Sequence, residues 1–213
     1  MSNEFGYIPE SPEQSFGNNK GIFTPTDIYD LTRADKYTNY GQLELIETQT
    51  VSSATAQVDF TSIQESTYNV HFLTVNNFKP EIDNAQLMMR FYESGVLESA
   101  SVYQFAYQYG SGTGNFNDSN TTSATYIRAS SGVGNFGSEN GHSYSYLYNL
   151  GNSSKYSFQT FHNTYINKTP DNFFMFGSGV LPQASTVDGI RLQPTSGDIE
   201  EVSVSLYGIK EYS

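Results

Sequence analysis

The sequence contains no cysteine and no tryptophan, and only 15% of its residues are charged. Without cysteine, the chain cannot form disulfide bridges or thiolate metal sites. Lys and Arg together number 10 against 22 Asp and Glu, which gives a formal net charge of -12 at pH 7. Nucleic acids and anionic membranes both require a cationic protein surface, so the charge balance predicts neither as a partner.

Long apolar runs and familiar catalytic motifs are missing as well. No stretch approaches membrane-spanning length, and no basic segment followed by an apolar one predicts a signal peptide at the start. We therefore expect no membrane insertion. The glycines of residues 110–114 lack the Gly-Lys-Ser/Thr ending of a phosphate-binding loop, and no nucleophile-elbow sequence occurs. A carboxylate pair for glycoside hydrolysis stays open, because its spacing is set in space rather than in sequence.

What the chain does contain is typical of β-structure. Its 213 residues include 17 Tyr, 15 Phe and 18 Gly, and its polarity comes from Ser, Thr, Asn and Gln. Strand-forming and turn-forming residues outnumber strong helix formers. A chain of this length can bury a core without covalent cross-links. The composition therefore predicts a β-rich globular protein that needs no cofactor for its stability.

The most informative stretch is residues 187–209. Ile190 and Leu192 alternate with polar neighbours, residues 194–197 (PTSG) interrupt the run, and alternation resumes at Val202. A period of two residues gives a strand one apolar and one polar face, so we expect two half-buried strands joined in a hairpin. Two strands are marginal in water, and the rest of the chain must therefore supply an opposing sheet.

Short strands are expected throughout the chain from residue 41 onward, separated by turns rich in Gly, Asn and Ser. Further strand patterns occur at residues 43–47, 57–60, 70–75, 87–92, 103–109, 126–127, 144–150, 156–160 and 173–176. Residues 110–123 and 132–141 are predicted to be loops. No helical crossovers separate the strands, so the pattern predicts an all-β jelly roll or β-sandwich over residues 41–213.

Residues 1–40 predict an extended arm followed by one short helix. Thr24, Pro25 and Asp27 provide a helix cap, a first helical residue and an acidic first turn, which predicts a helix over residues 25–34. So short a helix must dock on something. The arm has no periodicity, and it is either a frayed terminus or an anchor laid on a neighbouring molecule. The predicted anchoring side chains are Phe5, Tyr7, Ile8, Phe16, Ile22, Phe23, Ile28 and Leu31.

Two sets of polar side chains are candidates for a metal site. The three histidines, His71, His142 and His162, are too far apart in sequence for ligand spacing, and they predict structural or surface roles. Four carboxylates cluster around the last two strands, and they predict a solvated strand end, with calcium binding as the alternative. These are Asp188, Asp198, Glu200 and Glu201. No catalytic, cofactor or metal residue is predicted.

The aromatic residues near the predicted loops are candidates for ligand contact. Phe116 and Phe136 lie in Gly/Asn-rich segments, and Tyr107 and Tyr109 lie close by in sequence. Rigid rings provide a large contact area at a low entropy cost, so these four side chains predict a contact with a receptor or glycan. The alternative is that the loop aromatics fold back over the ends of the sandwich.

The chain also resembles a family of virion proteins. Residues 189–192 (GIRL) and 203–209 (SVSLYGI) resemble the final strands of a recurrent domain in tailed-phage virion proteins, which ends in a Ser-x-Tyr-Gly-Ile-type strand. Residues 68–73, 141–149 and 174–179 occupy the places of the family's other strands. The segment 21–31 is similar to short N-terminal modules of marine-phage structural proteins.

The resemblance implies a jelly-roll domain displayed on a virion and assembled in the cytoplasm of the host bacterium. We expect a non-enzymatic accessory protein of the capsid-decoration or head-fibre type, anchored by its N-terminal arm. Its partners would be further copies of itself, with a trimer favoured, and capsid or tail proteins. The alternative is a tail-associated adhesion domain that binds a receptor or a host surface glycan.

Overall fold

The computed structural model describes residues 14–15, 18–19, 24–34, 36 and 42–211. The chain divides into two compact units, Met1–Gln42 and Leu43–Ser213. The N-terminal unit contains a two-strand pairing that the sequence did not suggest, between β1 (Gln14–Ser15) and β2 (Asn18–Asn19), and the helix α1 (Pro25–Arg33). No helix in the described part of the chain is long and apolar enough to cross a membrane.

The predicted helix is confirmed, together with its cap. The Thr24 side chain accepts a hydrogen bond from the Asp27 amide, and the Asp27 carboxylate accepts one from the Thr24 amide at 2.8 Å. This reciprocal capping box satisfies two amides that the first helical turn would otherwise leave unpaired. Hydrogen bonds donated to the Asp27 carboxylate, first by the Thr24 hydroxyl at 2.6 Å and second by the Thr24 amide, hold the pKa of Asp27 below its ordinary value.

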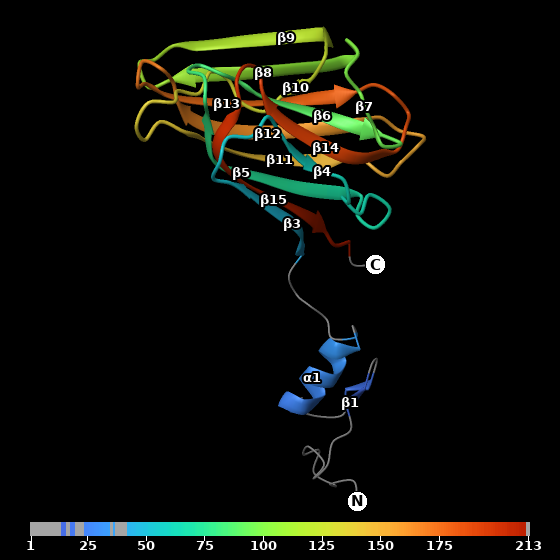
Figure 1. Cartoon of the computed structure of the whole chain (residues 1–213). Coiled ribbons are helices and arrows are strands. Elements are labelled where there is room, and N and C mark those ends of the chain that lie inside the picture. Colours follow the sequence, from blue (N-terminus) through green and yellow to red (C-terminus); the bar gives the residue numbers. More distant parts are fainter. Residues whose placement is uncertain (1–13, 16–17, 20–23, 35, 37–41, 212–213) are drawn as a thin grey trace, which may run out of the picture. The chain divides into compact units, whose positions relative to one another are not determined.

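The second unit is an all-β sandwich of two antiparallel sheets, as predicted (Figure 1). In spatial order, the large sheet consists of β3 (Leu43–Val51), β15 (Ile199–Ile209), β5 (Val70–Pro80), β11 (Gly141–Tyr148), β12 (Ser157–Ile166), β13 (Asn172–Leu181), β8 (Tyr103–Ser111) and β9 (Phe116–Ala124). The small sheet consists of β10 (Ile127–Arg128), β6 (Leu87–Glu93), β14 (Val187–Pro194) and β4 (Val58–Phe60), and β7 (Val96–Leu97) pairs with β6.

The strand order is that of a jelly roll with two inserted hairpins. Four strands of the large sheet, β3-β15-β5-β11, face the four strands β4-β14-β6-β10 of the small sheet. The chain passes from one sheet to the other at every step between these eight strands except from β6 to β10, which gives the nested pairing of a jelly roll. The hairpins β8–β9 and β12–β13 are insertions, and both add strands to the large sheet.

The prediction of a hairpin over residues 187–209 is wrong. Strands β14 and β15 follow one another in the chain, but β14 pairs with β4 and β6 in the small sheet, whereas β15 pairs with β3 and β5 in the large sheet. Their apolar side chains, including Leu192 and Val204, are buried in the core between the sheets. Period-two alternation reports that a strand is half-buried, and it does not report which strand lies beside it.

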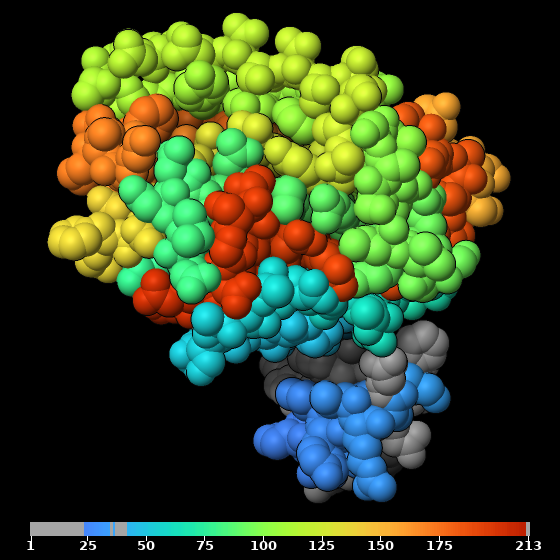
Figure 2. Space-filling model, turned by 45° about the horizontal axis from the view of Figure 1, so that its top comes forward, coloured from blue at the N-terminus to red at the C-terminus, as the bar shows by residue number. Residues whose placement is uncertain are grey.

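The connection between β14 and β15 crosses the edge of the sandwich beside the segment that joins β3 to β4. Thr55 and Ile199 form an isolated antiparallel bridge, with hydrogen bonds of 3.1 and 2.7 Å between their backbones. In Figure 2 the red surface of the late strands accordingly lies against the cyan surface of residues near 55. This bridge closes the edge of the sandwich between the two layers.

The predicted loop over residues 110–123 is also wrong, because most of it is strand β9. This strand pairs with β8 along its length and forms one edge of the large sheet. A tight turn at residues 111–115 connects the two strands, with Gly114 at a φ of 90°. Most of the side chains of β9 are exposed, so its sequence lacks the apolar alternation that identifies a half-buried strand.

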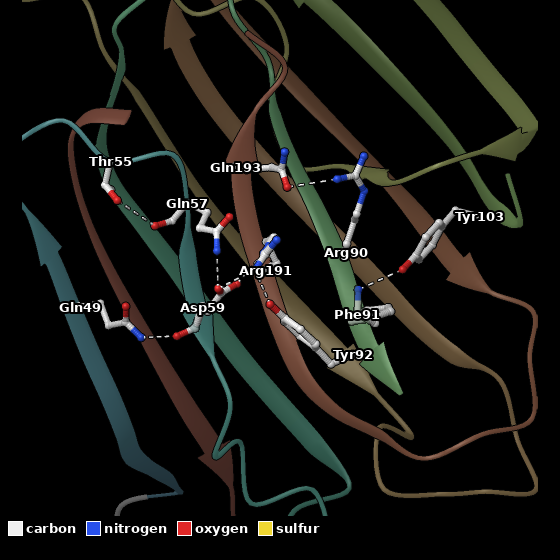
Figure 3. A network of polar contacts seen from close by, with 10 residues as sticks. All are labelled: Gln49, Thr55, Gln57, Asp59, Arg90, Phe91, Tyr92, Tyr103, Arg191 and Gln193. Atoms are coloured by element: carbon white, nitrogen blue, oxygen red, sulfur yellow. Dashed lines mark hydrogen bonds and ion pairs between the residues drawn. The ribbon is translucent and has the colours of Figure 1, made fainter. Parts of the chain in front are cut away.

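A polar network on the outer side of the small sheet connects three of its strands (Figure 3). The Arg191 guanidinium on β14 donates to both carboxylate oxygens of Asp59 on β4, at 2.7 and 2.8 Å, and to the Tyr92 hydroxyl on β6 at 2.5 Å. Burial raises the pKa of Asp59, but the hydrogen bonds from Arg191 and Tyr92 outweigh it and hold the pKa below its ordinary value. The short strand β4 thus gains a side-chain attachment to its neighbour.

We expect Asp59→Asn to lower the free energy of unfolding by about 1–2 kcal/mol, because it leaves a half-buried guanidinium without its carboxylate. Glu200→Gln is the matched control, since it removes the exposed Lys79–Glu200 ion pair, and its effect should stay below about 0.5 kcal/mol. Urea unfolding at pH 7 measures both. Equal effects of the two substitutions would show that the network has no special role.

One histidine lies inside the core of the sandwich. His71 on β5 is fully buried, and its Nε2 lies 2.7 Å from the Ile63 carbonyl, so that nitrogen carries a proton and donates it. Its Nδ1 has no partner. Burial lowers the pKa of His71 in spite of the Ile63 contact, because a charged ring would lose its hydration.

We therefore expect the free energy of unfolding to fall as the pH is lowered below about 6.5, where an exposed histidine begins to take up a proton. The unfolded chain binds that proton and the folded chain resists it, so the loss for this residue cannot exceed about 1.4 kcal/mol per pH unit. Urea unfolding at pH 7.5 and 5.5 measures it. The dependence should weaken in His71→Gln and persist in His142→Gln, and the opposite pattern would refute this assignment.

Candidate binding surface

The outer face of the large sheet carries a continuous band of aromatic rings. We call it the aromatic face and define it as Tyr207, Phe72, Tyr146, Tyr144, His162, Phe176, Phe174 and Phe116. Each ring lies 5.0–6.4 Å from the next, measured between ring centroids. Such separations are those of favourable aromatic pairs. The rings come from six strands, namely β15, β5, β11, β12, β13 and β9, and the band crosses a seventh, β8, at Gly110.

Strand register places these rings opposite one another. Tyr144 pairs with His162 on β12, and His162 pairs with Phe176 on β13. Tyr146 pairs with Phe72 on β5, which pairs in turn with Tyr207 on β15. Directly paired side chains in adjacent strands are close enough to touch. The ladder of the sheet therefore brings together rings that are widely separated in sequence.

The rings belong to strands whose opposite face lies in the core. On β11 the buried side chains include Ser145 and Leu147, whereas Tyr144 and Tyr146 are 43% and 37% exposed. On β12 Phe161 is buried and His162 is exposed. An outward aromatic side chain is not required by the core, so its presence on several adjacent strands calls for another explanation.

The aromatic face ends at the β8–β9 edge of the sheet, where a glycine lies between its last two rings. Gly110 on β8 pairs with Phe174 and with Phe116. A Cβ atom built on Gly110 would lie 2.8 Å from the Phe174 ring and 2.9 Å from the Phe116 ring. The two rings therefore occupy the space that a side chain would take at this position. A larger residue here would displace them.

Two adjoining grooves follow strand β12 between the rings of the aromatic face. One has a volume of about 440 Å³ and is lined by residues that include Phe72, Asn76, His142 and Thr164. The other has a volume of about 410 Å³ and is lined by residues that include Tyr146, Thr160 and Phe176. Tyr144 and His162 line both grooves, so the two form one depression, which we call the β12 groove.

The surroundings of the β12 groove are nearly free of charge. The five adjacent strands β11, β12, β13, β8 and β9 contain a single residue that is Asp, Glu, Lys or Arg, namely Asp118. The chain as a whole carries a net charge of -12. Its negative charges are therefore concentrated elsewhere, and this side of the sheet presents aromatic rings, hydroxyls, amides and imidazoles.

The aromatic residues singled out in the sequence are divided by the structure. Tyr107 is buried on the inner side of β8, where its hydroxyl accepts a hydrogen bond from Arg128 at 2.7 Å, and Tyr109 packs against the same core. Phe116 is 73% exposed and ends the aromatic face, and Phe136 is 83% exposed on the loop before β11. Neither phenylalanine folds back over the core, and the four do not form one site.

The predicted anchoring residues lie mostly outside the described part of the chain. This applies to Phe5, Tyr7, Ile8, Phe16, Ile22 and Phe23. Ile28 and Leu31 are on one side of α1, and no residue of this helix is buried. On this apolar side of the helix, Ile28 is 37% exposed and Leu31 is half-buried.

Two of the four carboxylates considered for calcium binding have other partners. Asp188 accepts a hydrogen bond from the Gly95 amide, whereas Glu200 pairs with Lys79. Within the described ranges, no group of three or more His, Asp or Glu side chains could hold a metal ion.

Sequence inspection identified neither the aromatic face nor the position of His162 within it. The available signal was the set of alternating aromatic residues in β11 and β13, but alternation alone does not show which face of a strand is outward. The comparisons do not add to this picture: the chain matches no protein-family model, and no curated protein or solved structure is significantly similar to it.

We expect the rings of the aromatic face to contribute little to stability. Tyr144→Thr and Phe176→Thr should each lower the free energy of unfolding by no more than about 1 kcal/mol, because both side chains remain partly exposed and only ring contacts are lost. Phe161→Ala, on the inner face of β12, is the control and should cost about 3–5 kcal/mol. Urea unfolding measures all three. A large cost for the outward rings would give them a structural role.

Proposed function

We propose that the protein is a non-enzymatic structural protein of a tailed-phage virion, an accessory protein of the capsid-decoration or head-fibre type. The observation that carries this proposal is the N-terminal helix. It has nine residues, a complete capping box and no buried residue. Helices of this length are marginal in water, so a partner must cover its apolar side. Together with the resemblance of the last strands to virion domains, this supports an attachment role for residues 1–40.

Assembly with further copies of the chain belongs to the same proposal, and a trimer is the favoured form. The large sheet ends in strands β3 and β9, and the small sheet ends in β4 and β10. Free strand edges present unpaired backbone groups, and symmetric assembly is a common way to cover them. Other virion proteins, of the capsid or the tail, would receive the N-terminal unit.

A second candidate function is that of a tail-associated adhesion domain that recognises a receptor or glycan. The specific observation in its favour is the aromatic face, which is exposed, continuous and nearly uncharged. Surface patches of this kind mark binding sites in soluble proteins. The two functions differ in where the protein sits on the particle and in whether the sandwich binds a ligand.

The attachment role is tested on particles. We expect the protein to be present in purified virions by mass spectrometry, and immunogold labelling should place it on the head. Deletion of residues 1–20, or the substitutions Ile28→Asp and Leu31→Asp, should reduce its particle-bound amount at least tenfold, because they remove or charge the proposed anchor. The melting temperature of the sandwich should not change.

Thr26→Asp is the matched control for this experiment. It adds the same charge on the opposite side of α1, in the first turn, where an acidic residue is favourable, and it should leave attachment intact. If the protein still attaches to particles after deletion of residues 1–20, the proposed anchoring role is refuted. Labelling of the tail would favour the adhesion function, and absence of the protein from particles would end the virion proposal.

A further inference from the structure

The β12 groove has a polar floor and aromatic walls. Its floor consists of the outward side chains of β12, namely Thr160, His162 and Thr164, all of which are exposed. Tyr146 and Tyr144 flank this row on β11. On the other side, Phe176 and Phe174 flank it on β13. The groove therefore offers ring surfaces on both sides of a line of hydrogen-bonding groups.

The apolar groups of this surface are aromatic and not aliphatic. The outward positions of residues 142–148, 158–164 and 172–178 carry only aromatic, histidine, hydroxyl and amide side chains. The buried core of the same molecule, in contrast, is rich in Leu, Ile, Val and Met. Permanent interfaces between identical chains resemble such a core cut in half. The composition of the groove is therefore unlike that of a permanent interface.

We propose that the β12 groove binds a segment of an uncharged polysaccharide. A sugar ring has an apolar C–H face, which can stack on the rings of Tyr144 and Phe176, and hydroxyls at its edge, which can bond to Thr160 and His162. A volume of 410–440 Å³ for each half of the groove is within the range of small-ligand sites. This inference deepens the second candidate function and does not depend on the virion assignment.

The charge of the protein favours an uncharged ligand over an anionic one. Strands β11, β12 and β13 contain no Asp, Glu, Lys or Arg, and Lys79 on β5, the fourth strand that lines the groove, is paired with Glu200, so these strands offer no unpaired Lys or Arg to an acidic sugar. The net charge of -12 repels anionic chains over a longer range. An uncharged sugar meets neither obstacle, and its binding should be nearly independent of salt.

The groove is also held in shape before any ligand arrives. Strand β12 is paired on both sides over most of its length, with β11 and with β13. The Tyr144 hydroxyl lies 3.0 Å from His162 Nδ1, and the Thr164 hydroxyl donates to the Phe173 carbonyl at 3.2 Å. Side chains that are already ordered lose little entropy when a ligand binds, which favours affinity.

The test is affinity electrophoresis of the full chain in native gels that contain laminarin, galactomannan, dextran or, as the anionic probe, alginate. We expect at least one neutral polysaccharide to retard the protein and alginate not to do so. Tyr144→Ala and Phe176→Ala should each weaken this binding at least tenfold, whereas Tyr144→Phe should retain it because the ring is kept. Phe136→Ala and Tyr156→Ala, which remove exposed rings outside the groove, are the controls.

Mass photometry of the same variants tests the competing occupant, a second copy of the chain. A wild-type oligomer that dissociates in Tyr144→Ala and Phe176→Ala would assign the aromatic face to self-assembly and overturn the proposal. Retardation by alginate alone, by none of the four polysaccharides, or to the same extent in every variant would overturn it as well. The virion proposal can fail independently, since that failure is an absence of the protein from particles.

Discussion

The sandwich depends on the layer of apolar side chains between its two sheets. Fully buried residues from the small sheet, such as Phe60 and Ile190, meet fully buried residues of the large sheet, such as Leu147 and Leu206. Burial of each such side chain contributes about 1.5–3 kcal/mol. Because every strand can direct only one face to this layer, the sequence of each strand must alternate, and its other face is left for water or for a partner.

The two inserted hairpins increase the area of the outward face. They double the number of strands in the large sheet relative to its jelly-roll half, from four to eight, while the small sheet has five strands, including the short β7. Their inner side is covered in part by β10 and by the segment that follows it, where Ala129 and Val133 are buried and the Asn163 side chain donates to the Ala129 carbonyl at 3.0 Å. Their outer side has no such cover in the described chain, and it carries half of the aromatic face, namely His162, Phe176, Phe174 and Phe116.

Sequence patterns locate those strands of this fold that bury one face in the core. The patterns around Leu73 and Phe91 locate β5 and β6, and the capping residues locate α1, because each pattern reflects a local physical requirement. Leu43 and Leu45, which marked β3, are instead 49% and 59% exposed. The edge strand β9 escaped prediction because neither of its faces is strongly apolar. The pairing of β14 and β15 with different sheets escaped it because alternation carries no information on neighbours.

The sequence predicted that exposed aromatic rings would form the candidate site, but it did not predict which residues do so. Exposed aromatic residues were expected to form a contact surface, and Phe116 does lie in the aromatic face, but the sequence grouped it with Tyr107, which lies in the core. The residues that surround the β12 groove come from β5, β11, β12 and β13, and only the strand register brings them together. His162 belongs to the aromatic face because the sheet places it between Tyr144 and Phe176, and its sequence neighbours give no hint of this position.

Few charged side chains lie on the strands that carry the aromatic face, although the chain as a whole is strongly acidic. A protein with a net charge of -12 has ample means to keep a wide sheet soluble, since acidic side chains at outward positions prevent association. The strands from β11 to β9 nevertheless carry one charge, Asp118, and present Tyr146, Phe174 and Phe176 to solvent. An exposed apolar sheet face is a liability for aggregation, and the core gains nothing from it. Such a surface is consistent with selection for contact, and its hydroxyl and amide groups favour a ligand that is polar but uncharged.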